Sequence, residues 1–132
     1  MSREDALLAI EAFYESEAFY DLLNRRVGFR TESNLPGCEA ELQRYLDEEM
    51  VPYLTQMGFS CVIHKNPRAT AGPLLIAQRC EDDAHPTIMT YGHGDVVAGY
   101  DEQWQDNMSP WKVTKSNDIW YGRGTADNKG QH

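Results

Sequence analysis

The stretch that decides the fold of this 132-residue chain begins with Tyr91-Gly92-His93-Gly94-Asp95-Val96-Val97. On an extended backbone, side chains two residues apart point to the same side, so His93 and Asp95 are expected to project together. A neutral imidazole is a good ligand for a divalent metal, and a carboxylate beside it can hold the ring and raise its basicity. The glycines at 92 and 94 would let the backbone come close to whatever is bound. Such pairs also occur among ordinary surface and core residues, so the pair alone leaves both interpretations open.

A second glycine-rich stretch follows, Tyr121-Gly122-Arg123-Gly124-Thr125-Ala126-Asp127-Asn128-Lys129-Gly130. It is not a dinucleotide-binding fingerprint, because Asp127 occupies the place of the third glycine in G-x-G-x-x-G. It is not a phosphate-binding loop either, because no Gly-Lys followed by Ser or Thr closes it. What remains is a carboxylate in a tight turn, and a carboxylate can bridge two metal ions. A charged surface turn is the alternative interpretation.

Together and in this order, the two stretches resemble the M20 family of metallopeptidases. The shared features are residues 92–97, Trp104, Ser109-Pro110-Trp111 and residues 121–130. The resemblance extends upstream over two expected helices, Gly58-Phe59 and three expected strands, so it covers essentially the whole chain. Position 111 differs conservatively from the family pattern: this chain has Pro110-Trp111 where many members have Pro-Phe. The family includes dipeptidases, tripeptidases, carboxypeptidases, aminoacylases and deacetylases.

The resemblance implies a role for each matching residue. His93 corresponds to the first metal ligand, and Asp95 corresponds to the acidic catalytic residue that orients this histidine. Asp127 corresponds to the carboxylate that bridges two metal ions. The family also has an unusual cis peptide directly after that aspartate, which places it between Asp127 and Asn128. Two further motif residues, expected only to hold the turn, are Arg123 and Lys129.

The resemblance implies hydrolysis of an amide bond in a small peptide or an N-acyl amino acid. In the complete enzyme, two divalent metal ions would share a bridging water. These ions would be zinc, with cobalt or manganese as alternatives. The metals would lower the pKa of that water toward 7, and a glutamate would take its proton. The motif is slightly closer to the dipeptidase branch than to the deacetylases. The alternative is a non-catalytic binding or vestigial module that retains part of the metallopeptidase fold.

Several parts of the family site have no counterpart in this sequence. The general-base glutamate, its metal-binding neighbour, a further acidic ligand and a C-terminal histidine all follow the bridging aspartate in the family. Residues 1–132 are therefore expected to be the N-terminal portion of a catalytic domain, without its lid domain and C-terminal half. Such a chain should bind metal weakly and should not hydrolyse peptides alone. Residues expected to be incidental are Glu48 and Glu49 on a solvated helix face, His64, His85 and His132.

Hydrophobic periodicity predicts an α/β fold with helices packed on a sheet. Helices are predicted over residues 3–25 and 38–57, and Pro52 should kink or split the second. Strands are predicted over residues 59–64, 73–79 and 87–91 in a mostly parallel or mixed sheet, followed by a hairpin around Ser116-Asn117-Asp118. An incomplete sheet would leave an unpaired edge, so homo-oligomerisation is expected.

The composition is that of a soluble globular protein. A net charge of -9 gives the chain no electrostatic attraction to nucleic acid or to an anionic membrane. The three cysteines, Cys38, Cys61 and Cys80, are far apart and form no C-x-x-C pair, which favours free thiols. No uninterrupted apolar run follows Met1, so a signal peptide is not expected, and the predicted location is the cytoplasm.

Overall fold

The computed structural model describes residues 2–68, 71–105 and 107–132. Helices precede strands along the chain, as predicted. The elements are α1 (Arg3–Tyr14), α2 (Glu17–Val27), α3 (Glu39–Tyr45), the π-helical turn η1 (Leu46–Met50), α4 (Val51–Gln56), β1 (Ser60–His64), β2 (Leu74–Gln78), the 3-10 turn η2 (Asp101–Gln103), β3 (Thr114–Ser116) and β4 (Ile119–Tyr121).

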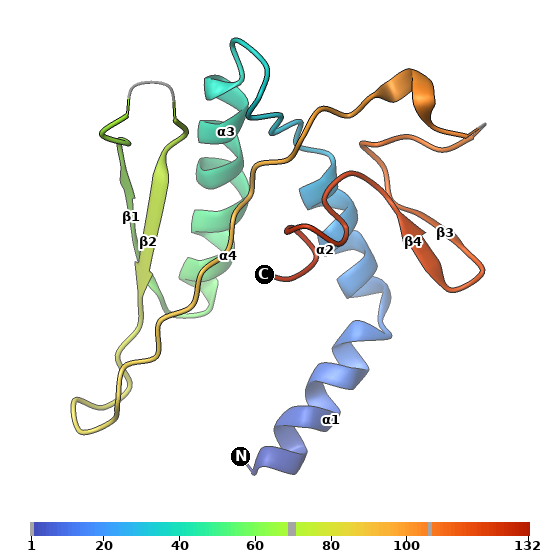
Figure 1. Cartoon of the computed structure of the whole chain (residues 1–132). Helices are drawn as coiled ribbons and strands as arrows, with labels where there is room; N and C mark the ends of the chain where they lie inside the picture. The colour runs from blue at the N-terminus through green and yellow to red at the C-terminus, as the bar shows by residue number, and fades with distance from the viewer. Residues whose placement is uncertain (1, 69–70, 106) are drawn as a thin grey trace.

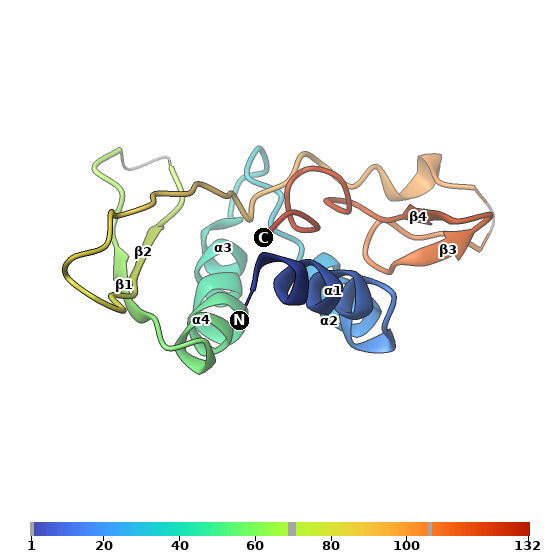
Figure 2. The ribbon, with the colours of Figure 1, turned by 90° about the horizontal axis from the view of Figure 1, so that it is seen from below.

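The helices lie between two hairpins. Figure 1 shows a continuous rod from α3 to α4 beside the β1–β2 hairpin, with α2 on the other side of the rod and the β3–β4 hairpin beyond α2. Figure 2 shows the same arrangement from below, with the two hairpins at opposite ends and the C-terminus between them. The end of the chain therefore reaches the centre of the molecule.

The predicted first helix is divided at Ser16. The Ser16 hydroxyl donates to the carbonyl of Phe13 across 2.5 Å and accepts from the amide of Phe19 across 3.3 Å. One side chain therefore stops α1 and caps α2, which apolar periodicity alone does not reveal. The capping box between Ser2 and Asp5 is present, with both of its hydrogen bonds formed. No residue of α1 is buried, so its apolar stripe is not part of the core.

Pro52 neither ends nor splits the second helix. The helical rod runs from α3 through η1 into α4, so residues 39–56 are helical where 38–57 were predicted. The turn ahead of the proline is widened, because the amide of Val51 donates to the carbonyl of Leu46, five residues earlier. We attribute the continuity to this π-helical turn, because proline has no amide hydrogen to donate within a regular turn.

The prediction of a mostly parallel or mixed sheet is wrong, because both sheets of the described residues are two-stranded and antiparallel. β1 pairs with β2, with Val62 opposite Ile76, and β3 pairs with β4. A parallel pair needs a crossover of about a dozen residues or more, and the link between β1 and β2 is shorter. The third predicted strand, residues 87–91, forms no strand within the described part of the chain. The late hairpin is confirmed, with Asn117 and Asp118 at φ 50° and 62° in its turn.

Two apolar clusters form the core. One contains Leu23 and Val27 of α2 with Val113, and the other contains Phe29, Tyr45 and Met50. Each cluster includes residues distant in sequence. The first cluster joins α2 to the segment before β3, and the second joins the loop after α2 to the α3–α4 rod.

The charged side chain of Glu49 is also buried, which corrects the expectation of a solvated helix face. It is 2% exposed, and its carboxylate contacts Nε of Arg25 at 2.5 Å and Nε of Arg26 at 3.1 Å. The carboxylate is acceptable inside the protein because two guanidinium groups compensate it. Its neighbour Glu48 is exposed, as predicted.

Within the described residues, no helix is both long enough and apolar enough to cross a membrane.

Candidate metal centre

The first motif is fixed against the loop that follows α2. The amide of Val96 donates to the carbonyl of Thr31 across 2.8 Å, and the amide of Ser33 donates to the carbonyl of Val96 across 3.2 Å. The Thr31 hydroxyl donates to the carbonyl of Gly94 at 2.5 Å, and the Ser33 hydroxyl donates to Oδ2 of Asp95 at 2.7 Å. These bonds hold the motif in place although it belongs to no multi-residue strand.

The second motif is a tight turn closed over the core. Gly124 has a φ of 92°, a conformation that favours glycine. The peptide bond between Asp127 and Asn128 is cis, which confirms the feature implied by the family resemblance. Nζ of Lys129 is buried and donates to the carbonyl of Phe29 across 2.7 Å, so this lysine anchors the turn, as expected.

The two motifs meet at His93 and Asp127. Nε2 of His93 lies 3.1 Å from Oδ1 of Asp127. On the other ring nitrogen, Nδ1 of His93 lies 3.2 Å from Oδ1 of Asp95 and 3.1 Å from the carbonyl oxygen of Asp95. The structure thus brings together all three residues that the sequence singled out, from positions more than thirty residues apart.

The hydrogen-bond partners define what each ring nitrogen of His93 can do. Both partners of Nδ1 are acceptors, so Nδ1 carries the hydrogen of a neutral ring. Nε2 then presents its lone pair to Asp127, and an ionised carboxylate has no hydrogen to donate. Two acceptors at this distance need a cation between them, either a proton or a metal ion.

The electrostatic setting of His93 agrees with this geometry. Partial burial works to lower the pKa of His93, but hydrogen bonding to the Asp95 backbone and the charges and hydrogen bonds of Asp95 and Asp127 outweigh it. The pKa of His93 is therefore raised above its ordinary value of 6.5. A site that attracts a proton to Nε2 also attracts a metal cation there.

The donor pair fits part of a metal site. Zinc binds imidazole nitrogen and carboxylate oxygen at about 2.0–2.2 Å, so two ligand atoms on one ion lie roughly 3 to 3.5 Å apart. The separation of 3.1 Å between Nε2 and Oδ1 meets this requirement. A catalytic zinc ion takes three protein ligands, however, and the described residues contain no group of three or more His, Cys, Asp or Glu arranged to hold a metal.

The structure gives Gly94 a role in packing that the sequence did not predict. A Cβ atom at this position would overlap the ring of Tyr45, a residue only 1% exposed. The glycine is therefore required by the packing of a core side chain against the motif backbone.

One residue at the site was missed by sequence reasoning. His132 was expected to be incidental, but its Nε2 lies 2.9 Å from the hydroxyl of Tyr45 and its Nδ1 lies 3.1 Å from Oδ1 of Asn128. Tyr45 is distant from His132 in the sequence, and Asn128 lies four residues before it in a turn outside every predicted helix and strand, so the sequence carries no clear signal for these contacts. His64 and His85 are exposed and lie outside the site.

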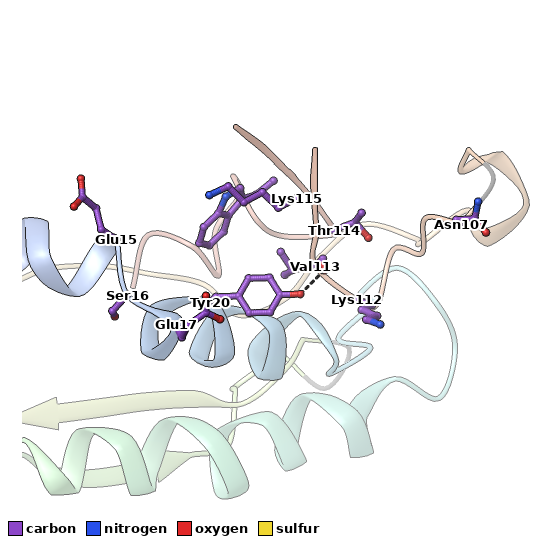
Figure 3. A pocket seen from close by; sticks show the side chains of 10 residues that line it. Glu15, Ser16, Glu17, Tyr20, Asn107, Lys112, Val113, Thr114 and Lys115 are labelled. Carbon is purple, nitrogen blue, oxygen red and sulfur yellow. Dashed lines mark hydrogen bonds between the residues drawn. The ribbon is translucent and has the colours of Figure 1, made fainter. Parts of the chain in front are cut away.

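The converging residues line a hollow of about 360 Å³. Its walls include Ser33, His93, Asp95, Arg123 and Asp127. A larger hollow of about 520 Å³ lies elsewhere, between the α1–α2 junction and the segment around β3. Figure 3 shows its lining side chains, with the hydroxyl of Tyr20 bonded to the carbonyl of Val113 at 2.9 Å. None of the site residues lines this second hollow, so volume alone does not locate the chemistry.

Comparison with known sequences points to one group of enzymes. A sequence model described as Peptidase family M20/M25/M40 matches residues 89–132. The chain is 33% identical over 93 residues to a succinyl-diaminopimelate desuccinylase of Legionella pneumophila (strain Corby), which covers 70% of this chain and 22% of that relative. It is 41% identical over 59 residues to Beta-Ala-His dipeptidase of Mus musculus, which covers 44% of this chain and 12% of that relative.

Comparison with solved structures gives the same grouping. Human carnosine dipeptidase 1 matches with a TM-score of 0.78 and 25% identity, over 96% of this chain and 28% of the dipeptidase chain. The di-peptidase Dug1p of Saccharomyces cerevisiae matches in fold with a TM-score of 0.74 and 21% identity, over 92% of this chain and 27% of that one. The chain therefore spans less than a third of the length of each of these proteins.

Proposed function

Because this chain belongs to the M20/M25/M40 peptidase family, we propose that residues 1–132 form the N-terminal portion of a metallopeptidase catalytic domain. The full-length protein would hydrolyse an amide bond at a site with two divalent metal ions. The observation that carries this proposal is the convergence of Nε2 of His93 and Oδ1 of Asp127 at 3.1 Å, with Asp95 on the opposite ring nitrogen.

Each of the three residues has a distinct task in this proposal. His93 and Asp127 bind metal, and Asp127 has a second carboxylate oxygen with which to bridge to another ion. Asp95 holds the hydrogen of His93 on Nδ1, which leaves the lone pair of Nε2 directed at the metal position. Two divalent metal ions, with zinc proposed and cobalt or manganese as alternatives, would supply a water of lowered pKa and a Lewis acid at this position.

The substrate proposed is a small peptide or an N-acyl amino acid. The names of the relatives support this class, because one is a dipeptidase and another is a desuccinylase. The hollow at His93 and Asp127 also contains Arg123, a cation that suits a substrate with a carboxylate. Its Nη2 donates to the carbonyl of Gly99 at 3.3 Å, and this neutral acceptor leaves the positive charge of the guanidinium uncompensated.

In this proposal the general base and the remaining metal ligands lie outside the described residues, because the described residues contain no group of three metal-binding side chains. We therefore expect the 132-residue chain to bind metal weakly and to leave dipeptides intact. Chelator-sensitive hydrolysis of β-alanyl-histidine by the purified chain would contradict this expectation.

A metal titration tests the ligand assignment directly. Calorimetry with zinc chloride should show weak binding by the chain, and this heat should disappear in His93→Ala and in Asp127→Ala. His85→Ala is the matched control, because His85 is an exposed histidine outside the site. Binding that survives both site substitutions would refute the assignment.

The second candidate function is that of a binding or vestigial module that retains part of the fold. The lack of a three-ligand group in the described residues favours it. The intact mass of the protein from its native cells separates the two candidates. A mass well above 15.1 kDa supports the catalytic proposal, whereas a mass near 15.1 kDa supports the module.

A further inference from the structure

His132 bridges the core of the protein and the turn that carries Asp127. Its ring is half-buried, with Nε2 2.9 Å from the hydroxyl of Tyr45 and Nδ1 3.1 Å from Oδ1 of Asn128. Tyr45 belongs to α3 and is 1% exposed, so it is a fixed anchor. The ring of His132 also meets the ring of Tyr45 edge to face, with centroids 6.4 Å apart.

The side chain of Asn128 links this bridge to His93. Its Oδ1 accepts a hydrogen bond of 3.1 Å from the backbone amide of His93, and its Nδ2 donates to Oε1 of Gln131. The amide orientation of Asn128 is thereby determined, because a backbone N–H can only donate. Asn128 is also the residue directly after Asp127, so one oxygen atom joins the two metal-binding segments.

These partners define the hydrogen positions of His132. Oδ1 of Asn128 is an acceptor, so Nδ1 of His132 must donate to it. Nε2 of a neutral ring then accepts from the Tyr45 hydroxyl. Burial works in the same direction by lowering the pKa of His132 to about 4, and burial also raises the pKa of Tyr45. Both groups therefore keep these roles at neutral pH.

We propose that His132 is a positioning residue, which holds Asn128 so that the Asp127 carboxylate stays opposite Nε2 of His93. The chain of contacts runs from α3 through Tyr45, His132 and Asn128 to the His93 backbone. The proposal rests on the proposed function in one respect, which is that His93 and Asp127 bind metal. The contacts themselves exist without metal and can be measured without it.

Three substitutions separate the two hydrogen bonds of His132. Asparagine places a donor near the position of Nδ1 and keeps the bond to Asn128. Glutamine places an acceptor near the position of Nε2 and keeps only the bond to Tyr45. Leucine keeps neither bond. His132→Asn should therefore preserve the positioning, and His132→Gln and His132→Leu should lose it.

The main measurement is amide hydrogen exchange by NMR on the metal-free 132-residue chain. Exchange at His93 should accelerate about fivefold in His132→Leu and His132→Gln and stay near the wild-type rate in His132→Asn. The Val96 amide, bonded to Thr31, is the internal control and should be unchanged. Nitrogen-15 shifts of the wild-type histidine rings should also show His132 protonated on Nδ1.

Three results would overturn the proposal: His132 protonated on Nε2 alone, unchanged exchange at His93 in His132→Leu, or equal acceleration at His93 and Val96. If His132→Leu does not fold, the comparison of His132→Asn with His132→Gln decides, and a better rescue by glutamine refutes the proposal.

Zinc affinity is the second measurement, and it should fall about tenfold in His132→Leu and recover in His132→Asn. If the wild-type chain binds no zinc, the metal function fails, while exchange at His93 still decides whether His132 positions the pair.

Discussion

Oδ1 of Asp95 lies 3.2 Å from Nδ1 of His93, at the ring nitrogen opposite to the one that faces Asp127. Asp95→Ala removes this carboxylate and leaves only the Asp95 carbonyl to hold the ring. We expect zinc affinity to fall about tenfold, because partners that orient a ligating histidine have effects of this size. Calorimetry measures this, with exposed Glu102→Ala as the control for lost negative charge. A similar loss in both variants would mean that Asp95 acts only through net charge.

The structure brings together the three residues that the two motifs and the family resemblance singled out, and their roles at a metal site stay a prediction. The two-residue spacing of His93 and Asp95 predicted that they project together, and the resemblance to the M20 family singled out Asp127 within its glycine-rich turn. The contacts of His132 could not be predicted, because they depend on where α3 places Tyr45. The reason for Gly94 was also hidden, since only the packed structure shows the Tyr45 ring against it.

Gly94→Ala should destabilise the fold without changing any charged group. The added methyl group would overlap the Tyr45 ring, which is buried and cannot move aside. Overpacking of this kind costs about 1–3 kcal/mol in the free energy of unfolding, measurable by urea denaturation. Gly92→Ala is the matched control, because its nearest contacts would be 3.3 Å away and should cost less. Equal effects in the two variants would disprove the role of Tyr45.

The parts of the fold that depend on local sequence could be predicted. The parts that depend on contacts between separate segments of the chain could not. The hairpin around Asn117 and Asp118 follows from residues that tolerate positive φ. The break at Ser16 depends on the hydrogen bonds that its hydroxyl forms, and the direction of β1 relative to β2 depends on how the two strands pair. The predicted strand at residues 87–91 has an apolar sequence typical of a buried strand, but it has no partner strand within the described residues.

Lys129 should make the stability of the fold depend on pH in the alkaline range. Burial lowers the pKa of Lys129 from 10.5 to about 7, against the opposite effect of nearby Asp95 and Glu41. Between these two values the unfolded chain binds the proton and the folded chain does not, so the free energy of unfolding rises with pH. Below about pH 7 both states are protonated and this contribution levels off at its least favourable value.

Lys129→Met tests this pH dependence by removing the titrating group. Between pH 7 and 10, the wild-type chain should gain stability relative to the variant by up to about 1.4 kcal/mol per pH unit. Urea denaturation at several pH values measures the difference, with exposed Lys65→Met as control. A constant difference between wild type and variant across this range would show that the lysine remains charged in the fold.

The exposed segment at residues 87–91 should cause the chain to self-associate. Ile88, Met89 and Tyr91 are 85%, 93% and 86% exposed, in a segment without a partner strand in the described part of the chain. An unpaired apolar edge of this kind is a template for another strand. Light scattering should therefore detect oligomers at high concentration, and Ile88→Lys/Met89→Lys should shift them toward monomers. The control is Leu8→Lys/Ile10→Lys, because Leu8 and Ile10 are also exposed apolar residues but the backbone groups of α1 are already bonded within the helix. A monomeric wild-type chain would exclude self-association. A stronger effect of the control substitutions would place the association at α1 and not at residues 87–91.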